Sequence, residues 1–271
     1  HGNVKEHLHH VDHLLYNKYW FMNLPFWYGR VIFWGLGLSL VIIGLRKLST
    51  AQDTDPNPGT SRLLKARFHS TYTLIIFALT ITFTGFDFMM GIDYKWYSTM
   101  WGVYLFAGSA LNSMAVIILV CAWLKSAGHL KHVTSGEHFH IMGKLLFAFT
   151  VFWAYVTFSQ YFLIWNANVP EETFWYNLRE IHADGTPSQW KYVGFFILFG
   201  HFLAPFLYLL SYKHKVTPAY IRPAAIWILG VILVDLCYNI LPALKDSHGD
   251  PLPFLSLNLL WVLTSVVGVG G

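Results

Sequence analysis

Seven apolar stretches of the sequence are about as long as a membrane crossing, and this feature limits the fold more than any other. A helix needs about 20 mostly apolar residues to cross the hydrocarbon core of a bilayer. The stretches lie at 27–46, 69–92, 100–124, 140–165, 191–212, 220–243 and 254–271. Only 12% of the residues are charged, about half the share in soluble domains. The sequence therefore predicts an all-α, polytopic transmembrane helical bundle of about seven helices, with a single transmembrane domain over 1–271.

The Lys and Arg residues between the stretches predict how the chain lies in the membrane. Cytoplasmic loops carry an excess of these residues, and the loops after the first, third and fifth stretches hold more of them than the other connections. We therefore expect a chain that starts outside the cytoplasm and ends inside it. Because the sequence begins with His1 rather than Met and stops without a polar flank, we interpret it as part of a longer chain.

The connection between the fourth and fifth stretches is rich in aromatic residues. Trp165, Trp175, Tyr176 and Trp190 fit a belt of aromatic side chains at the membrane surface. We expect a short helix there, lying on the membrane.

Several ionisable residues lie inside the stretches, where such groups are costly unless they are paired or hydrated. For Asp87, near the outer end of the second stretch, a structural hydrogen bond and a proton-relay role are equally open. His201 lies four residues before Pro205, so it could bond the carbonyl group that the proline frees or carry protons near neutral pH. Asp235 has Asn239 one turn later and nothing in its own helix to neutralise it, which favours a functional role.

The fourth stretch carries a polar stripe. His140 and Lys144 are four residues apart and share one helix face, which continues to Tyr155 and Ser159, with Gln160 beside it. A lone Lys near a membrane surface could simply extend its ammonium group to water. Together with the other polar side chains, a hydrated path is an equally open interpretation.

The sequence shows no recognisable site for haem, metal or nucleic acid. His69 and His140 could lie at matching depth as axial haem ligands, but His201 has no partner at its depth. His129, His132 and nearby histidines cluster without zinc-binding spacing. The basic residues form no stripe that would suit nucleic acid. We therefore expect no catalytic residue, cofactor or metal in this chain.

Several segments together resemble the ActF family, a membrane subunit of bacterial alternative complex III. That complex is a quinol:cytochrome c, or electron-acceptor, oxidoreductase. The segments that carry the resemblance are 85–104, 106–109, 143–149, 155–165 and 168–172, within a match over roughly 68–212. The family segment Ser-Phe-Asp-Trp reads Gly85-Phe-Asp-Phe88 here, and a turn proline after it is absent.

The resemblance implies a fold and a set of partners. ActF is related to the NrfD (polysulfide-reductase) membrane proteins, which are built from four-helix bundles. Since family members have about ten helices, about three N-terminal helices would be missing from this sequence. The implied protein lies in the bacterial cytoplasmic (inner) membrane, in contact with lipids. Its implied partners are an ActC-like NrfD protein, an ActB-like iron–sulfur subunit and multihaem cytochromes c, which hold the iron–sulfur clusters and haem c.

The resemblance also implies a role: a subunit of a quinol-oxidising respiratory or photosynthetic electron-transfer complex, without its own redox centre, that contributes a proton-conducting path. It brings in Asp87, Lys144, Tyr155 and Gln160 as candidates, while His201 and Asp235 come from their depth in the membrane and His140 from the polar stripe. The full set of proton-path candidates is Asp87, His140, Lys144, Tyr155, Gln160, His201 and Asp235. Two alternatives are that this chain itself binds quinol, as NrfD proteins do, or that it is purely a structural scaffold. A transporter would predict an internal repeat and discontinuous helices, and the sequence shows neither.

Overall fold

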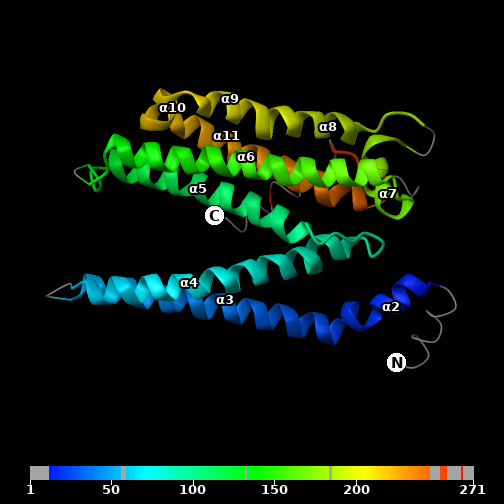
Figure 1. Ribbon diagram of the computed structural model, residues 1–271, viewed down its shortest axis with the longest axis horizontal. Helices are drawn as coiled ribbons and strands as arrows, with labels where there is room; N and C mark the ends of the chain where they lie inside the picture. Colours follow the sequence, from blue (N-terminus) through cyan, green and yellow to red (C-terminus); the bar gives the residue numbers. More distant parts are fainter. Residues whose placement is uncertain are drawn as a thin grey trace. The chain divides into compact units, whose positions relative to one another are not determined.

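The computed structural model describes residues 12–55, 59–131, 133–182, 185–244, 251–254 and 264. Within these ranges the chain is helical, with α2 to α11 joined by short turns (Figure 1). The only β-type pairing among the described residues is an isolated antiparallel bridge between Ile181 and Pro187. The predicted all-α fold is therefore confirmed for the described part of the chain.

Six helices are long and apolar enough to cross a membrane, as expected of a multi-pass membrane protein. They are α3 (Leu24–Asp53), α4 with its extension (Thr60–Ile92), α5 (Trp101–Ser126), α6 (Gly136–Ala167), α8 to α9 (Gln189–Leu210) and α11 with its extension (Pro218–Ala243). These helices confirm that the first six predicted stretches are helical. The predicted seventh, 254–271, lies almost wholly outside the described residues, so the described count is six rather than about seven.

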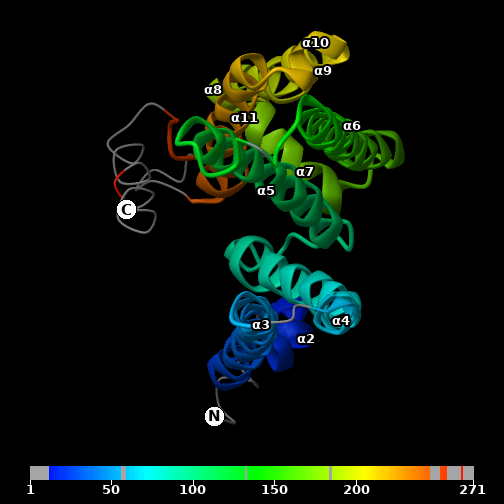
Figure 2. The same ribbon diagram turned by 90° about the vertical axis from the view of Figure 1, so that its left-hand side faces the viewer.

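The helices form two compact units, residues 1–106 and 107–271, and each is described by itself. In the first unit, α2 (His13–Met22) leads into α3, and α3 lies beside α4 (Figures 1 and 2). Asn23 ends α2 and starts α3, where its side-chain oxygen accepts a hydrogen bond from the Phe26 amide at 2.9 Å. Such a side chain satisfies one of the amides that a helix start leaves without a partner.

The second unit packs the later part of α5 with α6, α8–α9 and α11. Gly108 of α5 faces Trp153 of α6 and Ile232 of α11: a Cβ atom there would lie 3.8 Å and 3.6 Å from these side chains, in ordinary van der Waals contact. Leu111, Leu146 and Ile228 are fully buried in this interior. The short helix α10 (Tyr212–Val216) packs against α6, where Gly143 leaves room for Lys215.

The helix predicted in the aromatic connection is present as α7 (Pro170–Glu180). Trp165 is exposed, as a membrane-surface belt requires, but Trp175 and Trp190 are buried inside the second unit. The predicted belt is therefore wrong for these two side chains. Trp175 stacks on the guanidinium group of Arg179, and Trp190 packs with Cys237 and Leu241 at the end of α11.

Candidate functional site

Asp87 has a charged partner in the first unit. It lies in η1 (Gly85–Met89), a π-helical turn that continues α4. Arg30 of α3 donates from Nη2 to Oδ1 at 2.5 Å and from Nε to Oδ2 at 3.1 Å, and the two side chains are 8% and 4% exposed. Arg30 also bonds the Phe21 carbonyl at 2.8 Å and lies 3.7 Å from the Phe21 ring. The pair fixes α3 to the end of α4.

The sequence analysis missed this pair, although a signal for it was present. Arg30 falls inside the predicted first crossing, 27–46. An arginine within an apolar helix requires an acid or another acceptor nearby. Asp87, in the following crossing, was an acid that itself needed a partner.

Asp93 and the residues after it form a turn between the end of the α4 extension and α5. Its Oδ1 accepts a hydrogen bond from the Lys95 amide at 2.9 Å. Tyr94 donates from its hydroxyl to Asp12 Oδ2 at 2.7 Å, and Lys18 donates to the Tyr94 carbonyl at 2.5 Å. The hydrogen bond from Tyr94 lowers the pKa of Asp12 and raises the pKa of Tyr94. These contacts hold the start of α2 against the turn.

The polar stripe on α6 faces away from the interior of the second unit. Lys144 is exposed, Tyr155 is 66% exposed, and the His140 ring meets Tyr212 edge-on at 4.7 Å between centroids. Gln160, by contrast, is buried on the opposite side of the helix. The shared face predicted from spacing is present, but this unit by itself does not enclose it.

His201 is the most deeply buried candidate, with 0% of its surface exposed. Its ring lies 3.9 Å from the Trp153 ring, between centroids, and neither ring nitrogen has a hydrogen-bond partner in the described residues. It belongs to η3 (Leu198–Leu203), a π-helical segment between α8 (Gln189–Ile197) and α9 (Ala204–Leu210). Such segments often mark functional positions.

His201 does not satisfy the carbonyl group that Pro205 frees. In the i→i+5 register of a π segment, a proline at 205 removes the donor for the carbonyl of residue 200. Trp227 of α11 fills this role, because its Nε1 donates to the Gly200 carbonyl at 2.7 Å. The structural explanation that the sequence left open for His201 is therefore wrong.

Asp235 is buried in α11 (Pro218–Ile240), within a candidate membrane crossing. The Asn239 amide donates to the Asp235 carbonyl at 2.8 Å and lies 3.4 Å from its carboxylate. This contact confirms that the two side chains share a face. It also gives the Asp235 carboxylate a polar, uncharged neighbour in its own helix.

Arg179 belongs to α7 and lies against the C-terminal end of α11. It is fully buried and donates to the carbonyls of Trp175, Tyr238 and Asn239 at 2.6, 3.0 and 3.0 Å. A cation is favourable at a helix C-terminus, where backbone carbonyls lack partners. Arg179 thus ties α7 to the end of α11, beyond Asp235.

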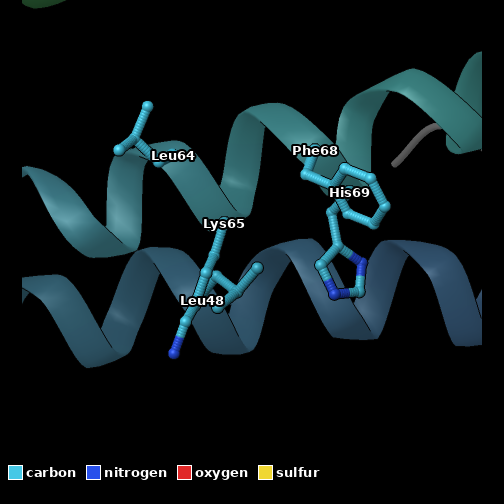
Figure 3. A pocket seen from close by; sticks show the side chains of 5 residues that line it. All are labelled: Leu48, Leu64, Lys65, Phe68 and His69. Atoms are coloured by element: carbon cyan, nitrogen blue, oxygen red, sulfur yellow. The ribbon is translucent and has the colours of Figure 1, made fainter.

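A hollow of about 370 Å³ opens between α3 and α4 in the first unit (Figure 3). Its lining residues are Leu48, Leu64, Lys65, Phe68 and His69. His69 shares a hydrogen bond with the Tyr72 hydroxyl and lies against Gly44 of α3. The hollow thus combines apolar side chains with a Lys and a His.

Within the described residues, no three His, Cys, Asp or Glu side chains come together as metal ligands. His132 of the predicted histidine cluster lies outside those residues, and His138 caps the start of α6 with Ser135. His69 and His140 belong to different units, so the structure does not test them as a haem pair.

No protein-family profile matches the sequence, and no curated protein is similar to it. The case for function therefore rests on side chains. In the second unit, His201 and Asp235 are buried within candidate membrane crossings, and the first unit holds a buried ion pair.

Proposed function

We propose that this chain is a membrane subunit of a quinol-oxidising electron-transfer complex of the ActF type, and that its second unit conducts protons. One observation carries the proton-conducting part: His201 and Asp235 are buried in the same helix bundle, each within a candidate membrane crossing. The resemblance of several segments to ActF supports the part that concerns the complex.

The surroundings of His201 favour a proton carrier over a structural role. Burial of a polar group without a hydrogen bond costs free energy, so a histidine in this position needs a compensating function. Trp227 already satisfies the Gly200 carbonyl beside it. Imidazole exchanges protons near neutral pH more readily than any other side chain.

Asp235 suits the outer part of the proposed path. It lies about two turns before the end of its crossing, whereas His201 lies near the middle of another. Proton transfer requires groups joined by hydrogen bonds or single waters, so water must connect these two side chains at least transiently. Arg179, one turn beyond Asp235, places a positive charge at the mouth of this path.

The other candidates take different places in this proposal. His140, Lys144 and Tyr155 lie on the outward face of α6, so they contribute to a path only where a partner subunit covers that face. An ActC-like protein is the partner that the resemblance implies. The Asp87 carboxylate forms an ion pair with Arg30. We therefore propose that Asp87 stabilises the first unit rather than serving as a proton exit.

Mass spectrometry of the complex purified natively through this chain tests the partners. We expect multihaem cytochromes, an iron–sulfur subunit and a second NrfD-type protein in equal amounts. Recovery of the chain alone would overturn the assignment to the complex and leave a transporter as the leading idea.

Proton release per electron, measured with the complex in liposomes, tests the path. Asp235→Asn and His201→Gln are expected to keep the haem content and quinol oxidation while lowering proton release. Glu171→Gln, at an exposed acid in α7, is the matched control and should change nothing. Unchanged proton release in both test variants would contradict the path, and a loss of yield alone would favour the scaffold alternative. A quinone bound to this chain would favour the quinol-binding alternative.

A further inference from the structure

The hollow between α3 and α4 has two kinds of lining. Figure 3 shows the side chains of Lys65 and His69 pointing toward α3, where Leu48 lies, whereas Leu64 points away from it. Leu64 is 61% exposed and Phe68 is 73% exposed. Large apolar side chains this exposed are favourable where hydrocarbon, rather than water, covers them. The hollow therefore offers an apolar surface with an ammonium group beside it.

The chain around the hollow is strongly basic. Residues 46–67 carry five Lys and Arg side chains against two carboxylates. Arg62 pairs with Asp55 at 3.0 Å, whereas Arg46, Lys47, Lys65 and Arg67 form no ion pair in the described residues. This region has an excess of positive charge that the unit does not neutralise. Such an excess at the edge of a membrane crossing attracts anionic lipid.

We propose that this hollow binds an anionic phospholipid. Lys65 receives the phosphate group, the neighbouring cations add a longer-range attraction, and an acyl chain lies along Leu64 and Phe68. A neutral headgroup, such as that of a quinone, would leave the positive charge without a counterion. His69 serves as a wall of the site, since its ring is held by Tyr72.

Native mass spectrometry of the delipidated protein, titrated with lipid, tests this site. The probes are phosphatidylglycerol and phosphatidylcholine with identical acyl chains. Since a Lys or Arg near an anionic surface is worth about 1 kcal/mol, Lys65→Gln should weaken phosphatidylglycerol binding about fivefold and leave phosphatidylcholine binding unchanged. Phe68→Ser, at an exposed position, should weaken the binding of both lipids.

Lys131→Gln is the matched control, because it removes one exposed cation from the other unit. It should leave phosphatidylglycerol binding unchanged. Equal affinity for the two lipids, or an equal effect of the control variant, would overturn the site. Competition by inorganic phosphate as strong as by the lipid would show that the acyl chain plays no part. A neutral quinone that phosphatidylglycerol fails to displace would also sink the proposal.

Discussion

The buried pair of Arg30 and Asp87 makes the sharpest prediction about stability. The guanidinium and carboxylate groups share two hydrogen bonds, of 2.5 and 3.1 Å, and both side chains are almost completely buried. Removal of one partner from a buried ion pair costs about 3–5 kcal/mol, because the other charge is left uncompensated. Replacement of both partners with apolar residues is often nearly neutral.

The contacts around the pair predict which single variant loses more of the free energy of unfolding. In Asp87→Asn, the amide oxygen still accepts one hydrogen bond, and Arg30 keeps the Phe21 carbonyl and ring. We therefore expect a loss near the lower limit, about 3 kcal/mol. Arg30→Met leaves the carboxylate buried without its cation, so its loss should approach 5 kcal/mol. The double variant Arg30→Met/Asp87→Leu should lie within about 1 kcal/mol of the unaltered protein.

Unfolding in mixed micelles with increasing dodecyl sulfate, followed by circular dichroism, measures these free energies. The two single variants and the double variant form a thermodynamic cycle in which a large favourable coupling energy is expected. Single losses below about 1 kcal/mol, or a double loss equal to the sum of the single losses, would show that the pair does not hold α3 to α4.

Two further predictions concern the first unit. Gly102→Ala should lower the free energy of unfolding by about 1–3 kcal/mol, because a Cβ atom there would lie 2.5 Å from the Thr82 hydroxyl. Gly37→Ala has open space around it and should stabilise α3 by about 0.5–1 kcal/mol. The same unfolding assay checks both, and equal effects of the two variants would contradict the packing described. The lowered pKa of Asp12 means that its bond with Tyr94 stabilises the fold above the ordinary carboxyl pKa of 3.8, and that this stability is lost as the pH falls through and below that value. Unfolding measured between pH 3 and 7 should therefore show a dependence that Asp12→Asn removes, and an identical pH profile in the variant would count against it.

The membrane crossings could be predicted because a bilayer leaves the backbone few choices. A chain in hydrocarbon must satisfy its own amides and carbonyls, so a long apolar stretch becomes a helix. The helix ends were less predictable. α3 continues to Asp53, beyond the predicted end at 46, and α4 begins at Thr60, before the predicted start at 69. Hydropathy carries no signal for helical turns that extend past the apolar region.

The candidate site was predictable in its residue types and less so in its contacts. Spacing correctly put His140, Lys144 and Tyr155 on one face of α6. It could not tell that this face is outward, because both sides of a membrane helix are apolar. Asp87 was chosen for its depth, but its partner Arg30 depends on the register between two helices, which one sequence does not contain. Burial of Trp175 likewise depends on how α7 folds back.

The π segment at 198–203 has a consequence for the whole fifth crossing. A π turn is equivalent to one extra residue in an α-helix, and one residue corresponds to a rotation of about 100°. The side chains before and after η3 therefore follow two helical patterns that are out of phase with each other. No single stripe of buried residues can run from Trp190 to Leu209, although both are buried. His201 lies at the change of phase, where one extra residue decides which way every later side chain points.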